Sequence, residues 1–94
     1  SYHHYGSVSQ RCARMLGSSA DKAAALTPGW LDGTLRDLSF YAGLRDQYEP
    51  GDKIWLTETA QAACGGSPWA ATYLDTFRYL NQLGVLAQKD VQVV

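Results

Sequence analysis

Glu58 has both the chemistry and the position of a candidate catalytic group. It lies in the stretch KIWLTETAQAACGG, residues 53–66, where it follows the short apolar run 54–56. Side chains alternate along a strand, so we expect the Glu58 carboxylate on the same face as Ile54 and Leu56. Such a carboxylate is either solvated at a strand end or placed at the mouth of a parallel barrel, where active sites of that fold lie. The strand alone favours the solvated carboxylate.

The opening residues SYHHY supply further candidates, because residues 1–5 are typical of a strand. His3 and Tyr5 share one face of it, whereas Tyr2 and His4 share the other and are assigned structural roles against helices. Adjacent histidines on opposite faces do not make a metal site, so we predict none. Parallel pairing would bring His3, Tyr5 and Glu58 to one rim.

A tyrosine hydroxyl beside a glutamate can hold the carboxylate ionised and oriented, and a histidine can contact sugar hydroxyls. Core or rim packing is the alternative role for Tyr5, and a structural role is the alternative for His3. Together these residues are the equipment of a retaining glycosidase, whose nucleophile lies about 5–5.5 Å from a second, protonated carboxyl group.

Two pairs of a capping hydroxyl and a proline, Thr27-Pro28 and Ser67-Pro68, predict helices over residues 28–48 and 68–83. Strands are predicted at 1–5, 53–58 and 91–94, and residues 8–26 form a partly helical connection. The expected fold class is α/β, strand-helix-strand-helix-strand with parallel strands. Doubly wound sheets and (β/α)8 barrels both follow this pattern, but no glycine-rich phosphate loop supports the former. Aromatic residues at helical and strand spacing are assigned to the core: Trp30, Trp55, Trp69, Tyr73 and Phe77.

The composition limits the other function classes. The chain has 94 residues, 46% of them hydrophobic and 18% charged, with a net charge of −1, which fits one small globular domain. It has no basic run for nucleic acid or an anionic membrane surface, and no apolar run long enough to span a membrane. The strand-like ends favour a piece of a longer protein. Cys12 and Cys64 are either a disulfide or two free thiols.

The segment KIWLTETAQAACGGSPWAATYLDTFRYLNQLG resembles the nucleophile strand and following helix of glycoside hydrolase family 79, the heparanase and β-glucuronidase family. The opening YHHY resembles the preceding barrel strand, and VQVV falls where the eighth strand begins. The resemblance covers nearly the whole chain and is weakest over residues 7–26. It implies that residues 1–94 are part of a catalytic TIM barrel, about strands 6 to 8.

The resemblance also implies a role for each candidate. Glu58 becomes the nucleophile, Tyr5 orients it, and His3 lines the sugar subsite. The backbone amides of Gly65 and Gly66 bind the uronic-acid carboxylate, because glycine lets N–H groups approach an anion and a helix starting at Ser67-Pro68 adds a favourable dipole. The alternative for the glycine pair is a tight turn. No cofactor is implied.

One catalytic part is absent from the sequence. The family's acid/base is the glutamate of an Asn-Glu-Pro motif, and the only Glu-Pro here, Glu49-Pro50, is predicted to end a helix. We therefore expect a fragment of a retaining β-glucuronidase or heparanase-like endo-β-glucuronidase that is inactive alone. Its partners would be a glucuronic-acid-containing glycan or glucuronide and the rest of the barrel, in a secreted, periplasmic or extracellular protein.

Two alternatives remain beside this interpretation. A non-catalytic carbohydrate-binding or interaction module on a barrel-derived scaffold would keep the fold without the reaction. An Asn-Glu dipeptide about a hundred or more residues upstream, as barrel length requires, would favour the enzyme. A related glycosidase acting on a neutral sugar is the third interpretation, and the glycine pair argues against it.

Overall fold

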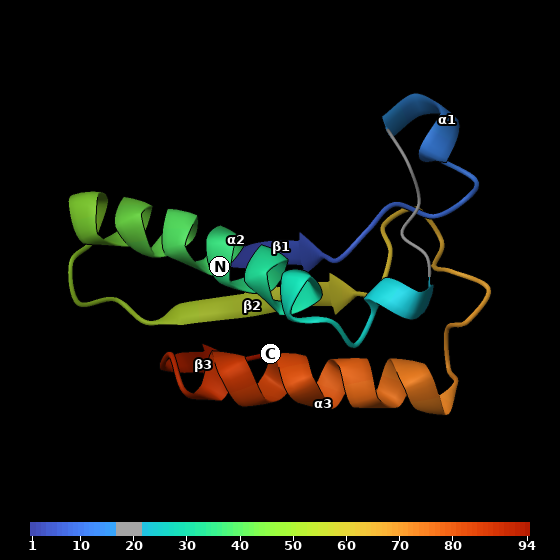
Figure 1. Cartoon of the computed structure of the whole chain (residues 1–94). Helices are drawn as coiled ribbons and strands as arrows, with labels where there is room; N and C mark the ends of the chain where they lie inside the picture. The colour runs from blue at the N-terminus through green and yellow to red at the C-terminus, as the bar shows by residue number, and fades with distance from the viewer. Residues whose placement is uncertain (17–21) are drawn as a thin grey trace.

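The computed structural model describes residues 1–16 and 22–94, and it is an open α/β sheet with helices (Figure 1). The elements in chain order are β1 (Tyr2–Tyr5), α1 (Ala13–Leu16), the 3₁₀ turn η1 (Lys22–Ala24), α2 (Pro28–Tyr48), β2 (Ile54–Ala60), α3 (Tyr73–Ala87) and β3 (Val91–Val93). The strands lie in the order β1-β2-β3, and both pairs are parallel. The predicted parallel α/β architecture is confirmed. The partly helical connection contains α1 and η1, and the part of that prediction on residues 17–21 lies outside the described residues.

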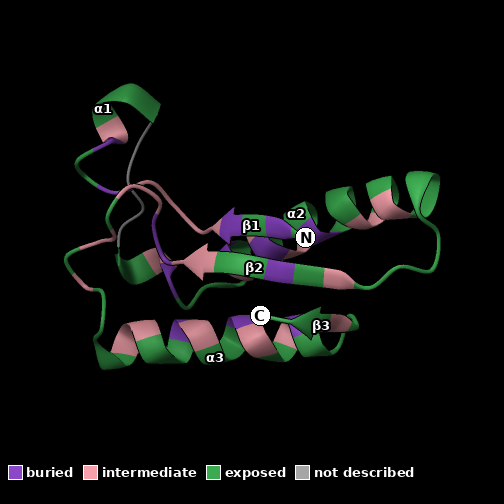
Figure 2. Ribbon diagram, turned by 180° about the vertical axis from the view of Figure 1, so that it is seen from behind, coloured by how far each residue is buried: buried purple, intermediate pink, exposed green. Residues whose placement is uncertain are grey.

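Both long helices cover the same side of the sheet. Strands that neighbour each other in chain order, joined by right-handed crossovers, place successive helices on one face, as in a barrel. The core follows this arrangement: Tyr2 and Leu56 of the sheet pack with Leu38 of α2 and Leu86 of α3. Figure 2 shows buried segments, in purple, on β1, β2 and α3. The other face of the sheet is open. The three strands and their helices are therefore consistent with a partial barrel.

Helix α2 begins where the sequence predicts, at Pro28 after the N-cap Thr27. The Thr27 hydroxyl makes no capping bond, because it donates instead to the Ala24 carbonyl oxygen at 2.7 Å. The helix ends at Tyr48. Gly51, with φ of 94°, then provides the left-handed turn that leads the chain into β2.

The predicted start of the second long helix, residue 68, is wrong, since α3 runs from Tyr73 to Ala87 and so continues past residue 83. Ser67-Pro68 does not start it, because Ala71 has a φ of 59° and this left-handed residue cannot belong to the helix. Thr72 is the N-cap, and its side chain accepts a hydrogen bond from the Asp75 amide. Gly84 does not interrupt the helix.

Three aromatic side chains expected in the core are largely exposed: Trp55 at 48%, Tyr73 at 86% and Phe77 at 57%. On α3 the buried residues are instead Arg78, Gln82 and Leu86, at four-residue steps. Arg78 and Gln82 can face the sheet because their side chains bond to each other. The apolar side of α3 therefore faces outward. Trp30 is buried as predicted and packs edge-to-face on Trp69 at 5.9 Å.

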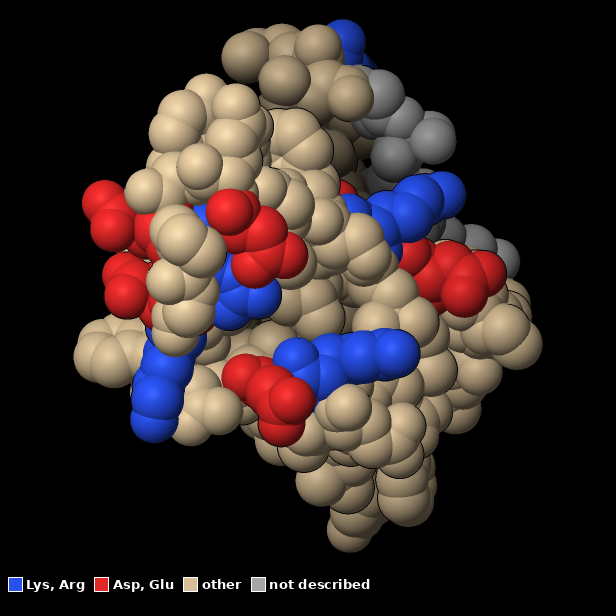
Figure 3. Space-filling view, turned by 90° about the vertical axis from the view of Figure 1, so that its left-hand side faces the viewer, with Lys and Arg blue, Asp and Glu red and all other residues tan. Residues whose placement is uncertain are grey.

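Charges of both signs are interspersed at the end of the sheet where the strands begin, as Figure 3 shows. Arg45 and Asp46 pair there at 2.6 Å. That face has no continuous basic surface. Among the described residues, no helix is long and apolar enough to span a membrane.

Candidate active site

A bulge in β2 decides which way Glu58 points. Tyr2 pairs with Leu56, but the next residue of β1, His3, pairs with Glu58, so β2 uses two residues where β1 uses one. Paired residues share a face and successive residues of β1 do not, so Leu56 and Glu58 lie on opposite faces. The expectation that Glu58 shares the face of Ile54 and Leu56 is therefore wrong. Alternation held only up to the extra residue, Thr57, whose hydroxyl donates to the Tyr2 carbonyl oxygen.

On the open face, the Glu58 carboxylate meets His3. The distance from His3 Nδ1 to Glu58 Oε2 is 3.7 Å, and the two side chains are 56% and 57% exposed. By contrast, Leu56 of β2 and His4 of β1 point to the helices and are buried. The structure thus brings together two of the predicted site residues, and both side chains are exposed to solvent.

Tyr5 lies at the end of β1, where it pairs with Ala60 rather than with Glu58. In the part of the chain that the structure describes, no hydrogen bond joins its hydroxyl to the Glu58 carboxylate. Tyr5 is half-buried. An orienting role for Tyr5 stays a prediction.

His4 and Tyr2 face the helices, as the alternation of β1 predicts. His4 Nδ1 lies 2.6 Å from the Asp37 carboxylate of α2, and His4 Nε2 lies 3.1 Å from the Thr34 hydroxyl. Tyr2 stacks on Tyr41 at 4.8 Å. These contacts attach β1 to α2 and leave His3 on the opposite face.

The glycine pair lies in a loop tied to the segment after β1. Cys64, Gly65 and Gly66 have φ of 69°, 103° and 79°, three successive left-handed residues. A disulfide joins Cys12 to Cys64, and the Ser9 hydroxyl donates to the Cys64 carbonyl oxygen at 2.7 Å. The sequence left the state of the two cysteines open, and the fold pairs them because both follow strand C-terminal ends.

A shallow hollow of about 310 Å³ lies at this junction, and its lining includes Gly65, Gly66 and the side chain of Arg11. The sequence did not single out Arg11, because one arginine in a weakly patterned segment carries no signal. The dipole expected behind the glycine pair is absent, since α3 begins only at Tyr73. Any anion here would be held by backbone amides and by Arg11.

Glu49 does not lie near Glu58. Glu49 is the C-cap of α2, and it lies beside Lys53 and Ser1, at the edge where the strands begin. Glu58 lies toward the opposite end of β2. No group of three or more His, Cys, Asp or Glu side chains within residues 1–16 and 22–94 is arranged to hold a metal ion.

The sequence is similar to heparanases over nearly its whole length. Heparanase of Gallus gallus is 33% identical over 94 residues, covering 99% of this chain and 16% of the relative. Heparanases of Mus musculus and Rattus norvegicus are each 31% identical with the same coverage. No protein-family profile matches the chain.

The chain thus spans 16% of the length of these relatives. Its parallel sheet, with both helices on one face, agrees with the barrel that the sequence resemblance implied. By sequence, the chain is similar to one segment of the heparanases, at 31–33% identity over nearly its whole length.

Proposed function

We propose that this chain contributes the nucleophile, Glu58, to a retaining glycoside hydrolase that acts on β-glucuronides. The observation that carries the proposal is the bulge, which turns Glu58 away from the helix layer and onto the open face beside His3. In a closed barrel that face lines the interior, and the strand C-terminal ends form the rim where active sites lie. Bulges next to active sites commonly re-aim a side chain in this way.

The reaction would proceed by double displacement. The Glu58 carboxylate attacks the anomeric carbon, and the bond to the leaving oxygen breaks as an acid/base group outside this chain protonates it. Water, deprotonated by that same group, then releases the sugar and regenerates the carboxylate. His3, next to the carboxylate, would contact a sugar hydroxyl, and Tyr5 would donate a hydrogen bond to Glu58 once the rim is complete.

The loop around the glycine pair supports a uronic acid as the bound sugar. Gly65 and Gly66 can expose backbone N–H groups without a side chain in the way, and Arg11 adds a positive charge to the same hollow. A neutral sugar would not need these groups. The Cys12–Cys64 disulfide supports an extracellular or secretory protein, because disulfides persist in oxidising compartments.

The remainder of the barrel is the proposed partner of the exposed apolar surfaces. Phe40 and Tyr48 of α2, and Tyr73 and Phe77 of α3, are all more than half exposed. Each pair is four or eight residues apart and so lies on one side of its helix, and exposed apolar residues on one side of a helix are typical of a face that another element covers. On a barrel, neighbouring helices would cover it.

The test replaces Glu58 by Gln in the full-length protein, which keeps the shape and removes the nucleophilic charge. Turnover of an aryl β-glucuronide should fall by several orders of magnitude, about the loss expected when a covalent catalyst is removed. A 2-fluoro-glucuronide inactivator should label Glu58 in the unsubstituted protein. Glu49→Gln is the matched control and should retain activity.

Near-normal turnover by Glu58→Gln, or a label on another carboxylate, would overturn the assignment. A full-length protein without any turnover that still binds glucuronides would support the carbohydrate-binding module instead.

A further inference from the structure

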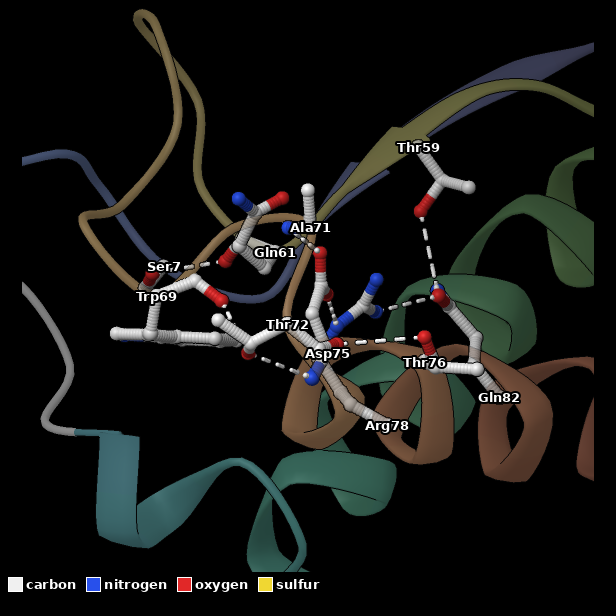
Figure 4. Close-up of polar contacts among 10 residues, drawn as sticks. All are labelled: Ser7, Thr59, Gln61, Trp69, Ala71, Thr72, Asp75, Thr76, Arg78 and Gln82. Atoms are coloured by element: carbon white, nitrogen blue, oxygen red, sulfur yellow. Dashed lines mark hydrogen bonds and ion pairs between the residues drawn. The ribbon is translucent and has the colours of Figure 1, made fainter.

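A chain of buried and half-buried polar side chains connects α3 to β2 just beyond the bulge, as Figure 4 shows. Asp75 accepts from Arg78 Nε at 2.7 Å, and Arg78 Nη1 donates to Gln82 Oε1 at 3.0 Å. Gln82 Nε2 donates to the Thr59 hydroxyl at 3.1 Å. Arg78 is 4% exposed and Gln82 has no exposed surface. The chain therefore ends on the residue that follows Glu58.

The contact with Arg78 orients the Gln82 amide, and the Thr59 hydroxyl also lies 3.5 Å from Gln82 Oε1. A guanidinium can only donate, so Arg78 requires the amide oxygen of Gln82. The amide nitrogen is then left to donate to Thr59. Asp75 in turn holds the guanidinium. Because the guanidinium is charged, its contact with Gln82 is charge-assisted and stronger than a neutral pair.

Thr59 and Glu58 are successive residues of β2, so their side chains leave opposite faces of the sheet. Holding Thr59 toward α3 therefore holds Glu58 toward the open face. In an alternative register without the bulge, Glu58 would share the face of Leu56 and point into the helix layer. The contact from Gln82 to Thr59 exists only in the bulged register.

We propose that Gln82, held by Arg78, is a positioning residue that sets the direction of the Glu58 side chain through Thr59. The inference rests on the proposed role of Glu58 as nucleophile. It assigns a function to two polar residues at sheet-facing positions of α3, where the neighbouring core residue, Leu86, is apolar. A displaced nucleophile costs turnover, since a misplacement of about 1 Å can cost about 100-fold.

The test uses the full-length protein and counts working sites by stoichiometric labelling with the fluoro-glucuronide. Thr59→Val keeps the branched shape and loses the hydroxyl, and Gln82→Met keeps the length and loses the amide. In both variants kcat per labelled site should fall about tenfold or more while KM changes by less than about twofold. Thr59→Ser and Gln82→Glu retain the contact and should restore kcat, because a carboxylate accepts from both Arg78 and the Thr59 hydroxyl.

Leu86→Val is the stability control, because it loosens the packing of α3 on the sheet away from Glu58. It should lower Tm and leave kcat per labelled site unchanged. Unchanged kcat per site in Thr59→Val and Gln82→Met, or a decrease in Leu86→Val that matches theirs, would overturn the positioning role. Near-normal turnover by Glu58→Gln would instead overturn the proposed function and this inference together, so the two failures are told apart.

Discussion

Glu58 Oε2 lies 3.7 Å from His3 Nδ1 on the open face of the sheet, although Leu56, two positions earlier on the same strand, is fully buried under the helices. In a regular strand, residues two apart share a face. The extra residue, Thr57, breaks this alternation immediately before the candidate nucleophile, Glu58. The hydrophobic core and the candidate site therefore lie on opposite faces of β2.

His3 should contribute to substrate binding. Replacing it by Ala in the full-length protein should lower kcat/KM for a β-glucuronide about tenfold, the worth of one hydrogen bond of about 1–1.5 kcal/mol. His3→Gln, which can still bond a sugar hydroxyl, should retain more activity. Equal kcat/KM for His3→Ala and the unsubstituted protein would remove His3 from the site.

Gly6 should not tolerate a side chain. A Cβ at this position would overlap the indole of Trp30, which is 7% exposed. Gly6→Ala should destabilise the protein by about 1–3 kcal/mol, the range for overpacking a rigid site, measured as the shift of the urea midpoint. Gly43, inside α2, is the matched control because an added Cβ there meets nothing. Gly43→Ala should stabilise by up to about 1 kcal/mol.

His4 should be needed for stability rather than for catalysis. His4→Leu removes the partner of the Thr34 hydroxyl, which has no exposed surface, so the loss should be about 1–3 kcal/mol. The double variant with Thr34→Val should recover part of this loss, since the buried hydroxyl is then removed and the half-exposed Asp37 carboxylate can bond to water. A double-mutant cycle from urea unfolding measures the coupling. Additive losses would argue against the contact.

The hydroxyl of Tyr2 should make the protein more sensitive to alkali. Burial of the hydroxyl, and secondarily the negative charge of Asp37, raises the pKa of Tyr2 from 10.0 to about 12. The unfolded chain loses this proton first, so its contribution to stability is complete below pH 10 and is lost as pH rises toward 12. Tyr2→Phe should flatten the fall of stability across that window. It should cost little at neutral pH, because the hydroxyl is buried without a partner.

The disulfide should stabilise the loops that flank the site. The cysteines are 52 residues apart, and closing a loop of that length is worth up to about 4 kcal/mol in the chain-entropy view. Cys12→Ser with Cys64→Ser should lower the unfolding midpoint, and reductant should lower that of the unsubstituted protein to the same level. If reductant has no effect on that midpoint, the thiols are not paired in solution.

Local patterns in the sequence were enough for the fold class. Proline and a capping residue at Thr27-Pro28, leucines at helical spacing in α2 and apolar runs at Ile54 and Val91 act within one turn or one strand. The alternation of β1 likewise predicted that His4 would face the helices. These preferences do not depend on the rest of the molecule, which is why they can be read from a single chain.

Tertiary structure decided what local signals could not. Ser67-Pro68 has the pattern of a helix start, but α3 begins only at Tyr73. Between them, Trp69 packs on Trp30 and Ala71 is left-handed. The polar stripe of α3 is buried because Arg78 bonds to Asp75 and Gln82 within the helix and Gln82 bonds to Thr59 of β2. Glu58 faces the open side because β2 pairs with β1 in a bulged register. Strand register depends on partners distant in sequence, so no pattern within residues 53–66 could reveal it.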